Sequence, residues 1–149
     1  MNGGLNHGEH GEHGDGENHR FEQGPRVCSE ELIGIVLDCA TEVHRRMGPG
    51  LLESVYELAM IVELAEHGVS ARRQVGVEVW YRGQNLGIGF RADIVVEECL
   101  LLELKAVEAI NAVHLAQTIT YLKLLGIKCG YILNFNCKLM KEGIKRVSI

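Results

Sequence analysis

The spacing of apolar residues changes along the chain, and each change predicts a different kind of element. After residue 28 the apolar residues recur at helical intervals, and Ser29 followed by Glu30 and Glu31 has the composition of a helix start. The sequence Gly-Pro-Gly at 48–50 ends this helix. A second helix is predicted over about 51–67, with a glycine directly after it.

The pattern then becomes typical of strands. Apolar and polar residues alternate over 75–81, which predicts a strand in which Trp80 and the valines contribute to the core. The later elements predicted from the sequence are strands over 86–96 and 100–107, a helix over 112–125, and short strands over 129–134 and 144–149. This order predicts an α/β fold, namely an open mixed β-sheet flanked by helices.

Residues 1–27 differ from the rest in composition. They repeat the triplet His-Gly-Glu and contain few side chains that could be buried, so we expect a disordered low-complexity tail. Its histidines at positions 7, 10 and 13 could bind a metal ion, but a flexible segment without fixed geometry makes a poor specific site. The remaining residues, 28–149, are expected to form one domain.

The net charge of the whole chain does not describe the predicted domain. The chain carries a formal net charge of −5, but its first 24 residues hold five acids and only one base. The remainder has 15 acids and 14 bases and is therefore almost neutral. Five scattered cysteines without C-x-x-C spacing indicate reduced thiols, and no apolar run is long enough to cross a membrane, so we expect a cytoplasmic protein.

The run 91-RADIVVEECLLLELKAV-107 is strongly apolar but contains Asp93, Glu103 and Lys105. A turn at 97–99 would place Asp93 nearly opposite Glu103, with Cβ atoms roughly 4.5–5.5 Å apart. Because strand side chains alternate between faces, Glu103 and Lys105 point the same way and Asp93 joins them. We therefore expect the hairpin to bury one face and to present two carboxylates and an ammonium group on the other.

These three charges favour a metal site. Two facing carboxylates repel each other and destabilise a sheet, and a cation removes that repulsion. Mg²⁺ binds one or two carboxylates, with waters and phosphate oxygens as its other ligands. Such an ion polarises a phosphodiester, and Lys105 could stabilise the developing negative charge. The alternative is a solvated strand face on which Lys105 is paired with an acid.

The same stretch resembles a known family. The sequence Arg-Ala-Asp ending at Asp93, followed ten residues later by Glu103-Leu-Lys105, is similar to the signature of the PD-(D/E)XK nucleases. Ala92 stands where the name of the superfamily has a proline, at a position that carries no chemistry.

Other motifs extend this resemblance. The stretch 50-GLLESVY-56 has the pattern of the GxxExxY proteins, a bacterial branch of the superfamily, and its surroundings at 43–57 are similar to that branch, as is 117–126. The resemblance covers nearly everything over 28–149.

The resemblance implies a restriction-endonuclease-like core and hydrolysis of phosphodiester bonds in nucleic acid, DNA being the expected substrate, with Mg²⁺ or Mn²⁺ as cofactor. Lys105 is implied to be the catalytic lysine. The implied metal ligands are Asp93, Glu103, Glu53 and the carbonyl group of Leu104. Without the resemblance, Glu53 would be interpreted as an ordinary acid in the first turn of a helix.

Three further residues are expected to bind substrate. Gln117 and Tyr121 match the Q-x-x-x-Y element of the exonuclease branch and share a helix face, where the amide could orient a phosphate and the ring could stack on a base. Tyr56 follows Glu53 by three residues and lies on the same face of its helix. An ordinary half-buried helix face is the alternative for Gln117 and Tyr121.

A different class of function also fits the sequence. A catalytically silent module that binds nucleic acid or a protein partner could keep this fold, and the near-neutral charge favours it slightly. The intact set of Asp93, Glu103 and Lys105 favours an active enzyme. A chain this small could act as a homodimer or with another protein. His44 falls in a resembling segment without an assigned role. His114 shares the helix face of Gln117 and Tyr121 and is expected to be a packing or surface histidine.

Overall fold

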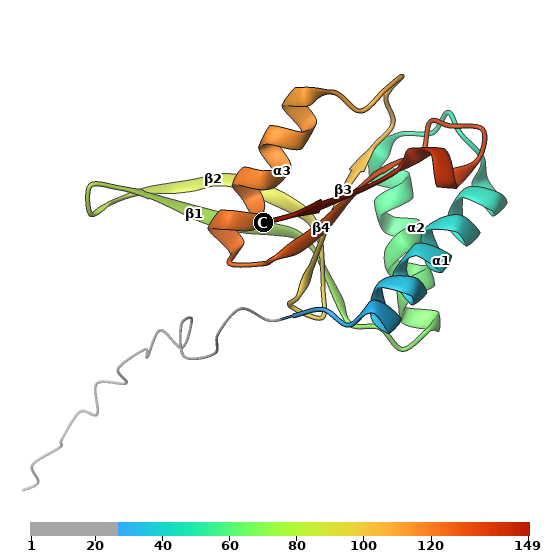
Figure 1. Cartoon of the computed structure of the whole chain (residues 1–149), viewed down its shortest axis with the longest axis horizontal. Helices are drawn as coiled ribbons and strands as arrows, with labels where there is room; N and C mark the ends of the chain where they lie inside the picture. The colour runs from blue at the N-terminus through green and yellow to red at the C-terminus, as the bar shows by residue number, and fades with distance from the viewer. Residues whose placement is uncertain (1–26) are drawn as a thin grey trace, which may run out of the picture.

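The computed structural model describes residues 27–149, which form a five-stranded mixed sheet with helices on both faces (Figure 1). The elements are α1 (Glu30–Met47), α2 (Glu53–Glu66), β1 (Ala71–Tyr81), β2 (Gln84–Val96), β3 (Leu100–Lys105), α3 (Ala112–Leu125), β4 (Cys129–Asn134), the 3₁₀ helix η1 (Met140–Gly143) and β5 (Ile144–Ser148). The predicted α/β class and the order of helices and strands are confirmed. The predicted tail and its histidines lie outside the described residues.

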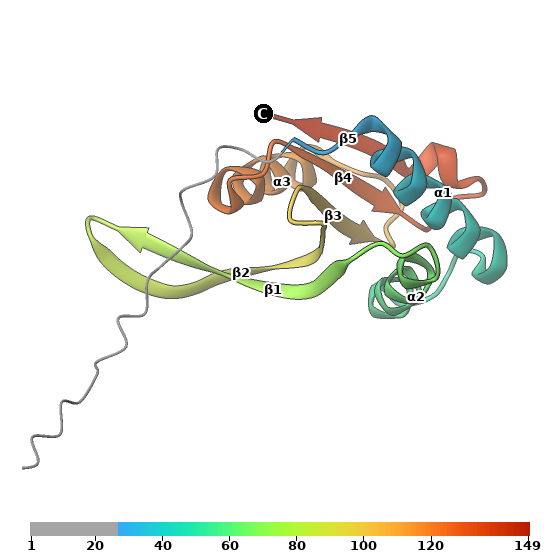
Figure 2. The ribbon, with the colours of Figure 1, turned by 90° about the horizontal axis from the view of Figure 1, so that it is seen from below.

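The sheet has the strand order β1-β2-β3-β4-β5. Neighbouring strands are antiparallel except β3 and β4, which are parallel and in register from Leu100 opposite Cys129 to Lys105 opposite Asn134. A parallel pair needs a crossover connection, and α3 supplies it. Figure 2 shows β3 and β4 at the centre of the molecule, between α3 and the α1–α2 pair.

Two layers of apolar side chains hold the helices to the sheet. Leu102 and Leu104 of β3 pack with the residues of α1 and α2, whereas Leu101 packs with Leu122 of α3 on the opposite face. Strand β3 is therefore buried on both faces, as is usual for a strand in parallel pairing. Among residues 27–149, no helix combines the length and the apolar character needed to cross a membrane.

The helix ends explain His44 and His114. Asn111 and His114 cap α3 reciprocally: the Asn111 side chain accepts the His114 N–H (3.0 Å), and His114 Nδ1 accepts the Asn111 N–H (3.2 Å). His44, near the end of α1, is buried and donates from Nε2 to the carbonyl group of Cys137 (2.8 Å). Both histidines therefore stabilise the fold. The predicted start of α1 is also confirmed, because Ser29 Oγ accepts the Leu32 N–H.

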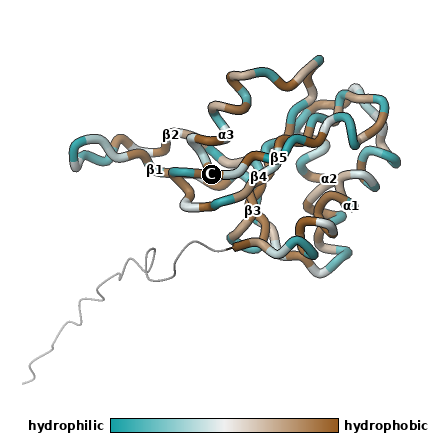
Figure 3. Tube along the Cα trace, in the orientation of Figure 1, coloured by the Kyte–Doolittle hydropathy of each residue, from teal (hydrophilic) through white to brown (hydrophobic). Residues whose placement is uncertain are grey.

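Strands β1 and β2 continue well beyond the rest of the sheet. They pair with each other from Ala71 opposite Val96 to Tyr81 opposite Gln84, and the pair extends away from the body of the molecule (Figures 1 and 2). Hydrophobic positions continue out along this extension (Figure 3). The expectation that Trp80 belongs to the core is wrong, because its side chain lies on this extension and is 61% exposed.

Candidate active site

The two acids of the predicted hairpin meet where β2 and β3 separate. The strands pair only from Ile94 to Val96, and Asp93 and Glu103 are the next positions outward. There, hydrogen bonds from backbone to side chain take the place of the backbone hydrogen bonds between the strands. Asp93 Oδ2 accepts the Leu104 N–H (2.8 Å), and Glu103 Oε1 accepts the Asp93 N–H (3.3 Å). The structure thus brings Asp93 and Glu103 together, and the backbone fixes the orientation of both carboxyl groups.

Glu103 is held away from bulk water, whereas Asp93 is half-buried and lines the cleft described below. Glu103 is only 4% exposed, and its pKa is raised to about 8, mainly by burial and then by the negative charge of Asp93. Burial also raises the pKa of Asp93. The alternative of a solvated strand face does not fit Glu103, because the side of β3 that carries Leu101 is covered by α3. Burial disfavours the charged form of a carboxyl group, so a cation beside Glu103 would stabilise its carboxylate.

Lys105 ends β3 two positions after Glu103 and is half-buried. Its positive charge lowers the pKa values of both Asp93 and Glu103, which shows that it lies near them. Lys105 forms no ion pair with an acid among residues 27–149. Its ammonium group is therefore close to the acids without being bound to either one.

Glu53 approaches the same place from the other side of a cleft. It is the first residue of α2, a helix whose N-cap residue, Leu52, makes no side-chain capping bond. The Glu53 carboxylate accepts the N–H of Ala106, directly after β3 (3.2 Å). This bond joins the beginning of α2 to the end of the strand that carries Glu103 and Lys105.

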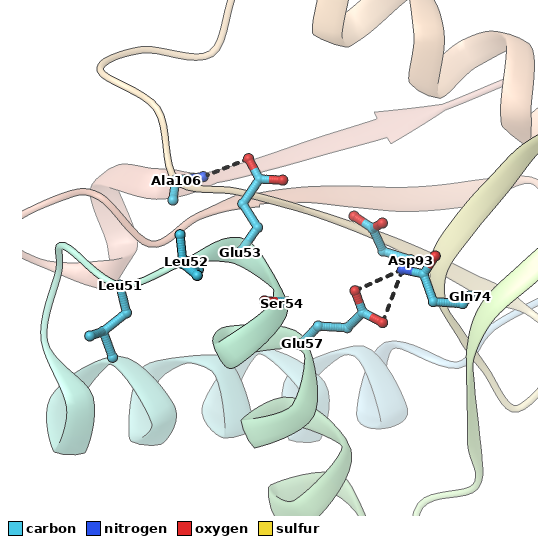
Figure 4. Close-up of a pocket in the computed structure, with 8 residues that line it drawn as sticks. All are labelled: Leu51, Leu52, Glu53, Ser54, Glu57, Gln74, Asp93 and Ala106. Atoms are coloured by element: carbon cyan, nitrogen blue, oxygen red, sulfur yellow. Dashed lines mark hydrogen bonds between the residues drawn. The ribbon is translucent and has the colours of Figure 1, made fainter.

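The cleft between these elements has a volume of about 570 Å³. Figure 4 shows Glu53 and Glu57 on α2 facing Gln74 and Asp93 on β1 and β2. The residues that line it are Leu51, Leu52, Glu53, Ser54, Glu57, Gln74, Asp93 and Ala106. Three of the eight are acids, so the cleft is suited to a cationic ligand.

Sequence reasoning missed Glu57, which lies one helical turn after Glu53 and is only 4% exposed. Its carboxylate accepts hydrogen bonds from Arg73 Nε (2.9 Å) and from Gln74 Nε2 (2.9 and 3.1 Å). Gln74 has a φ of 51°, a strained backbone conformation for a residue within a strand. The spacing of four between Glu53 and Glu57 was the available signal, since it places both acids on one helix face.

Replacing Glu57 with alanine should lower the free energy of unfolding by about 1–3 kcal/mol, because Gln74 and Arg73 lose their shared acceptor. Urea denaturation measures this change. Leu58→Ala on the exposed side of α2 is the matched control, with an expected change within about 0.5 kcal/mol. Equal stability of Glu57→Ala and the native protein would show that these bonds do not anchor β1 to α2.

Tyr121 lies beside the acids, but its ring already has a partner. It stacks on Phe90 with ring centroids 3.8 Å apart and planes 7° apart. Its pKa is raised by burial and further by the charges of Glu103 and Asp93, which places its hydroxyl group near the site. Gln117, one turn earlier on α3, is exposed. The face of the Tyr121 ring that packs on Phe90 is therefore not free to stack on a base.

Tyr56 does not fit the expected substrate-binding role. Its side chain is fully buried, and its ring stacks on Phe135 with centroids 4.5 Å apart. Its hydroxyl group donates to the Gly48 carbonyl group (2.6 Å) and accepts the Leu51 N–H (3.1 Å). Tyr56 therefore fixes the loop that leads into α2, and so places Glu53, without contacting a ligand itself.

The donor set suits a hard divalent cation. In residues 27–149, no three His, Cys, Asp or Glu side chains are already arranged as a metal cage. Mg²⁺ does not need one, because it binds through one or two carboxylates and completes its coordination with water and phosphate oxygens. Asp93 and Glu103 offer such a pair, and a bound cation would offset the burial and negative charge that raise the pKa of Glu103. The Leu104 carbonyl group stays a prediction as a ligand.

Comparisons with known proteins agree with this geometry. A family model described as the PD-(D/E)XK nuclease superfamily matches residues 30–147. Searches of curated proteins and of solved structures found no match. The matched segment contains every residue of the candidate site and all the helices and strands except the last residue of β5.

Proposed function

Because the chain belongs to the PD-(D/E)XK nuclease superfamily, we propose that it is an active nuclease that hydrolyses phosphodiester bonds in nucleic acid, with DNA as the substrate and Mg²⁺ or Mn²⁺ as the cofactor. Within the superfamily we assign it to the GxxExxY branch, on the motif at 50–56. The observation that supports activity best is the pairing of the buried Glu103 with the half-buried Asp93, with Lys105 beside them, where β2 and β3 separate.

Each residue has a distinct part in this proposal. Asp93 and Glu103 hold the metal ion, with Glu53 and the Leu104 carbonyl group as further ligands. The bound ion supplies Lewis acidity for the phosphate and lowers the pKa of a water molecule. Lys105 stabilises the negative charge that develops on the phosphate in the transition state. Gln117 and the Tyr121 hydroxyl group orient the substrate from α3.

The cell compartment forms part of the same proposal. All five cysteines are free thiols, and burial raises the pKa of Cys28 to about 12 and that of Cys39 to about 11. Such thiols are unreactive and suit the reducing cytoplasm.

A cleavage assay tests the proposal. Labelled single- and double-stranded DNA, single-stranded RNA and branched DNA should each be incubated with the native protein in Mg²⁺, Mn²⁺ or EDTA. We expect cleavage of at least one DNA substrate with metal and none with EDTA. Asp93→Asn, prepared in parallel, controls for contaminating nucleases. The variant should stay folded, because its amide oxygen can still accept the Leu104 N–H.

Two outcomes would contradict an active nuclease. Cleavage that is equal in the native protein and in Asp93→Asn comes from a contaminant. Binding of nucleic acid without cleavage in either metal would identify a silent binding module on the same fold.

A further inference from the structure

The extension of β1 and β2 has no third strand beside it within the described part of the chain, and only its base, at Phe90, contacts α3. We call residues 76–91 the hairpin arm. Strand β2 pairs with β3 only from Ile94 to Val96, so the arm consists of two strands without a third. Figure 2 shows it projecting from the body of the molecule, next to α3 at its base.

The arm exposes apolar side chains that a two-stranded ribbon cannot bury by itself. Its outer half carries four large apolar side chains that are each 54–62% exposed: Trp80, Tyr81, Leu86 and Ile88. Trp80 and Tyr81 are consecutive in β1, so their rings lie on opposite faces of the ribbon and both faces carry an exposed ring. The guanidinium group of Arg82, at the turn, lies 5.8 Å from the centre of the Tyr81 ring.

The arginines of the arm differ from all others in the described residues. Seven arginines lie in 27–149, and five of them form ion pairs with glutamates. The two that form no ion pair with a described residue are Arg82 and Arg91, and both belong to the arm. The arm contains one acid, Glu78, which forms an ion pair with neither arginine, so the arm carries a net positive charge.

We propose that the hairpin arm binds single-stranded nucleic acid, with bases stacked on Trp80 and Tyr81 and phosphates contacted by Arg82 and Arg91. Aromatic rings beside cationic groups are the usual way in which proteins hold unpaired bases without reading their sequence. The combination of exposed rings and unpaired guanidinium groups favours an anionic ligand with flat faces over an apolar one.

The size of the patch also argues against a second copy of the chain as the occupant. Aromatic side chains bury about 150–250 Å² each. Four large side chains that are little more than half exposed offer about 400–500 Å². A stable protein interface buries about 800 Å² on each partner. Binding of a few nucleotides does not require an interface of that area.

The arm is continuous with the cleft, which supports the same occupant. Strand β1 carries Gln74 at the cleft and Trp80 on the arm, six residues apart or about 20 Å along a strand. A strand of a few nucleotides held at Asp93 would therefore reach the aromatic residues. The inference rests on the proposed function for the identity of the ligand, but binding at the arm requires no cleavage.

Trp80 is the only tryptophan in the chain, so its fluorescence reports on the arm directly. The native protein should be titrated with a 20-nucleotide oligothymidylate in EDTA and low salt, where no metal-dependent cleavage takes place. We expect quenching of Trp80 emission, and an apparent Kd that rises with salt concentration. A duplex of the same length should quench at least fivefold more weakly, because its base faces are covered.

Variants test the individual residues. In fluorescence anisotropy with a labelled oligothymidylate, Trp80→Ala and Tyr81→Ala should each bind about 5- to 100-fold more weakly than the native protein. Val62→Ala on α2, which removes an equally exposed apolar side chain (63%), should bind as the native protein does. Circular dichroism and thermal denaturation establish that each variant is folded.

Three results would overturn the inference. The first is native affinity in both aromatic variants, and the second is equal quenching by duplex and single strand. The third is a shift of Trp80 emission with protein concentration alone, accompanied by a dimer in sedimentation, which would make a second copy the occupant. The proposed function is tested separately by the cleavage assay. If the native protein cleaves in Mg²⁺ while the arm variants bind oligothymidylate normally, the proposed nuclease function stands and only the proposal for the arm is rejected.

Discussion

Replacing Lys105 with alanine should lower the rate of metal-dependent cleavage by about 10²–10³-fold. Removal of one group that stabilises transition-state charge has an effect of this size in other enzymes. The loss should appear in kcat with little change in KM, because Lys105 acts on charge that develops in the transition state rather than on the bound substrate. Single-turnover cleavage of the preferred substrate measures it.

Lys128→Ala is the matched control, since it removes an exposed lysine from the loop between α3 and β4. It should cleave at the native rate. Thermal denaturation must show that Lys105→Ala is folded, because the lysine is half-buried and its methylene groups contribute to packing. A folded Lys105→Ala that retains more than a tenth of the native kcat would contradict the role assigned to the ammonium group.

Replacing Glu103 with glutamine should abolish cleavage and at the same time stabilise the metal-free protein above neutral pH. In the folded protein the pKa of Glu103 is about 8, against an ordinary value of 4.5. Between these values the folded state binds more protons than the unfolded state, so the free energy of unfolding falls as pH rises. Each pKa unit corresponds to about 1.4 kcal/mol, so the free energy of unfolding should fall by several kcal/mol.

Glutamine stays neutral and can still accept the Asp93 N–H, so this loss should be absent in the variant. Urea denaturation in EDTA at pH 5 and at pH 8.5 measures it: the native protein should be markedly less stable at the higher pH, and Glu103→Gln should change much less. Adding Mg²⁺ at pH 8.5 should stabilise the native protein more than the variant. Parallel pH profiles for the two proteins would show that Glu103 is not the group responsible.

The main features of the fold could be predicted because the residues that specify it act locally. Ser29 caps α1 and the glycine at position 126 ends α3, as their positions in the pattern indicated. The hairpin register followed in the same way from the turn at 97–99, and it placed Asp93 beside Glu103. Spacing along one strand or one helix was sufficient for each of these inferences.

The errors concern residues whose environment depends on distant segments. The apolar stretch around Trp80 looks like a buried strand, and only the early separation of β2 from β3 leaves it outside the sheet. Tyr56 shares a helix face with Glu53, but Phe135, 79 residues later in the chain, covers its ring. Glu57 was missed because its partners, Arg73 and Gln74, come from another element. Local patterns contain no information about such contacts.

The hydrogen bond from the Leu104 N–H to Asp93 Oδ2 has a consequence for how such a protein can evolve. A change of Asp93 to asparagine, one nucleotide away in the genetic code, keeps an acceptor for that N–H and removes the charge that the chemistry needs. A lineage under selection against cutting can thus lose activity in one mutational step and keep a stable protein. Binding at the arm would be unaffected by that step, so descendants could retain a role in holding nucleic acid after the ability to cleave it had gone.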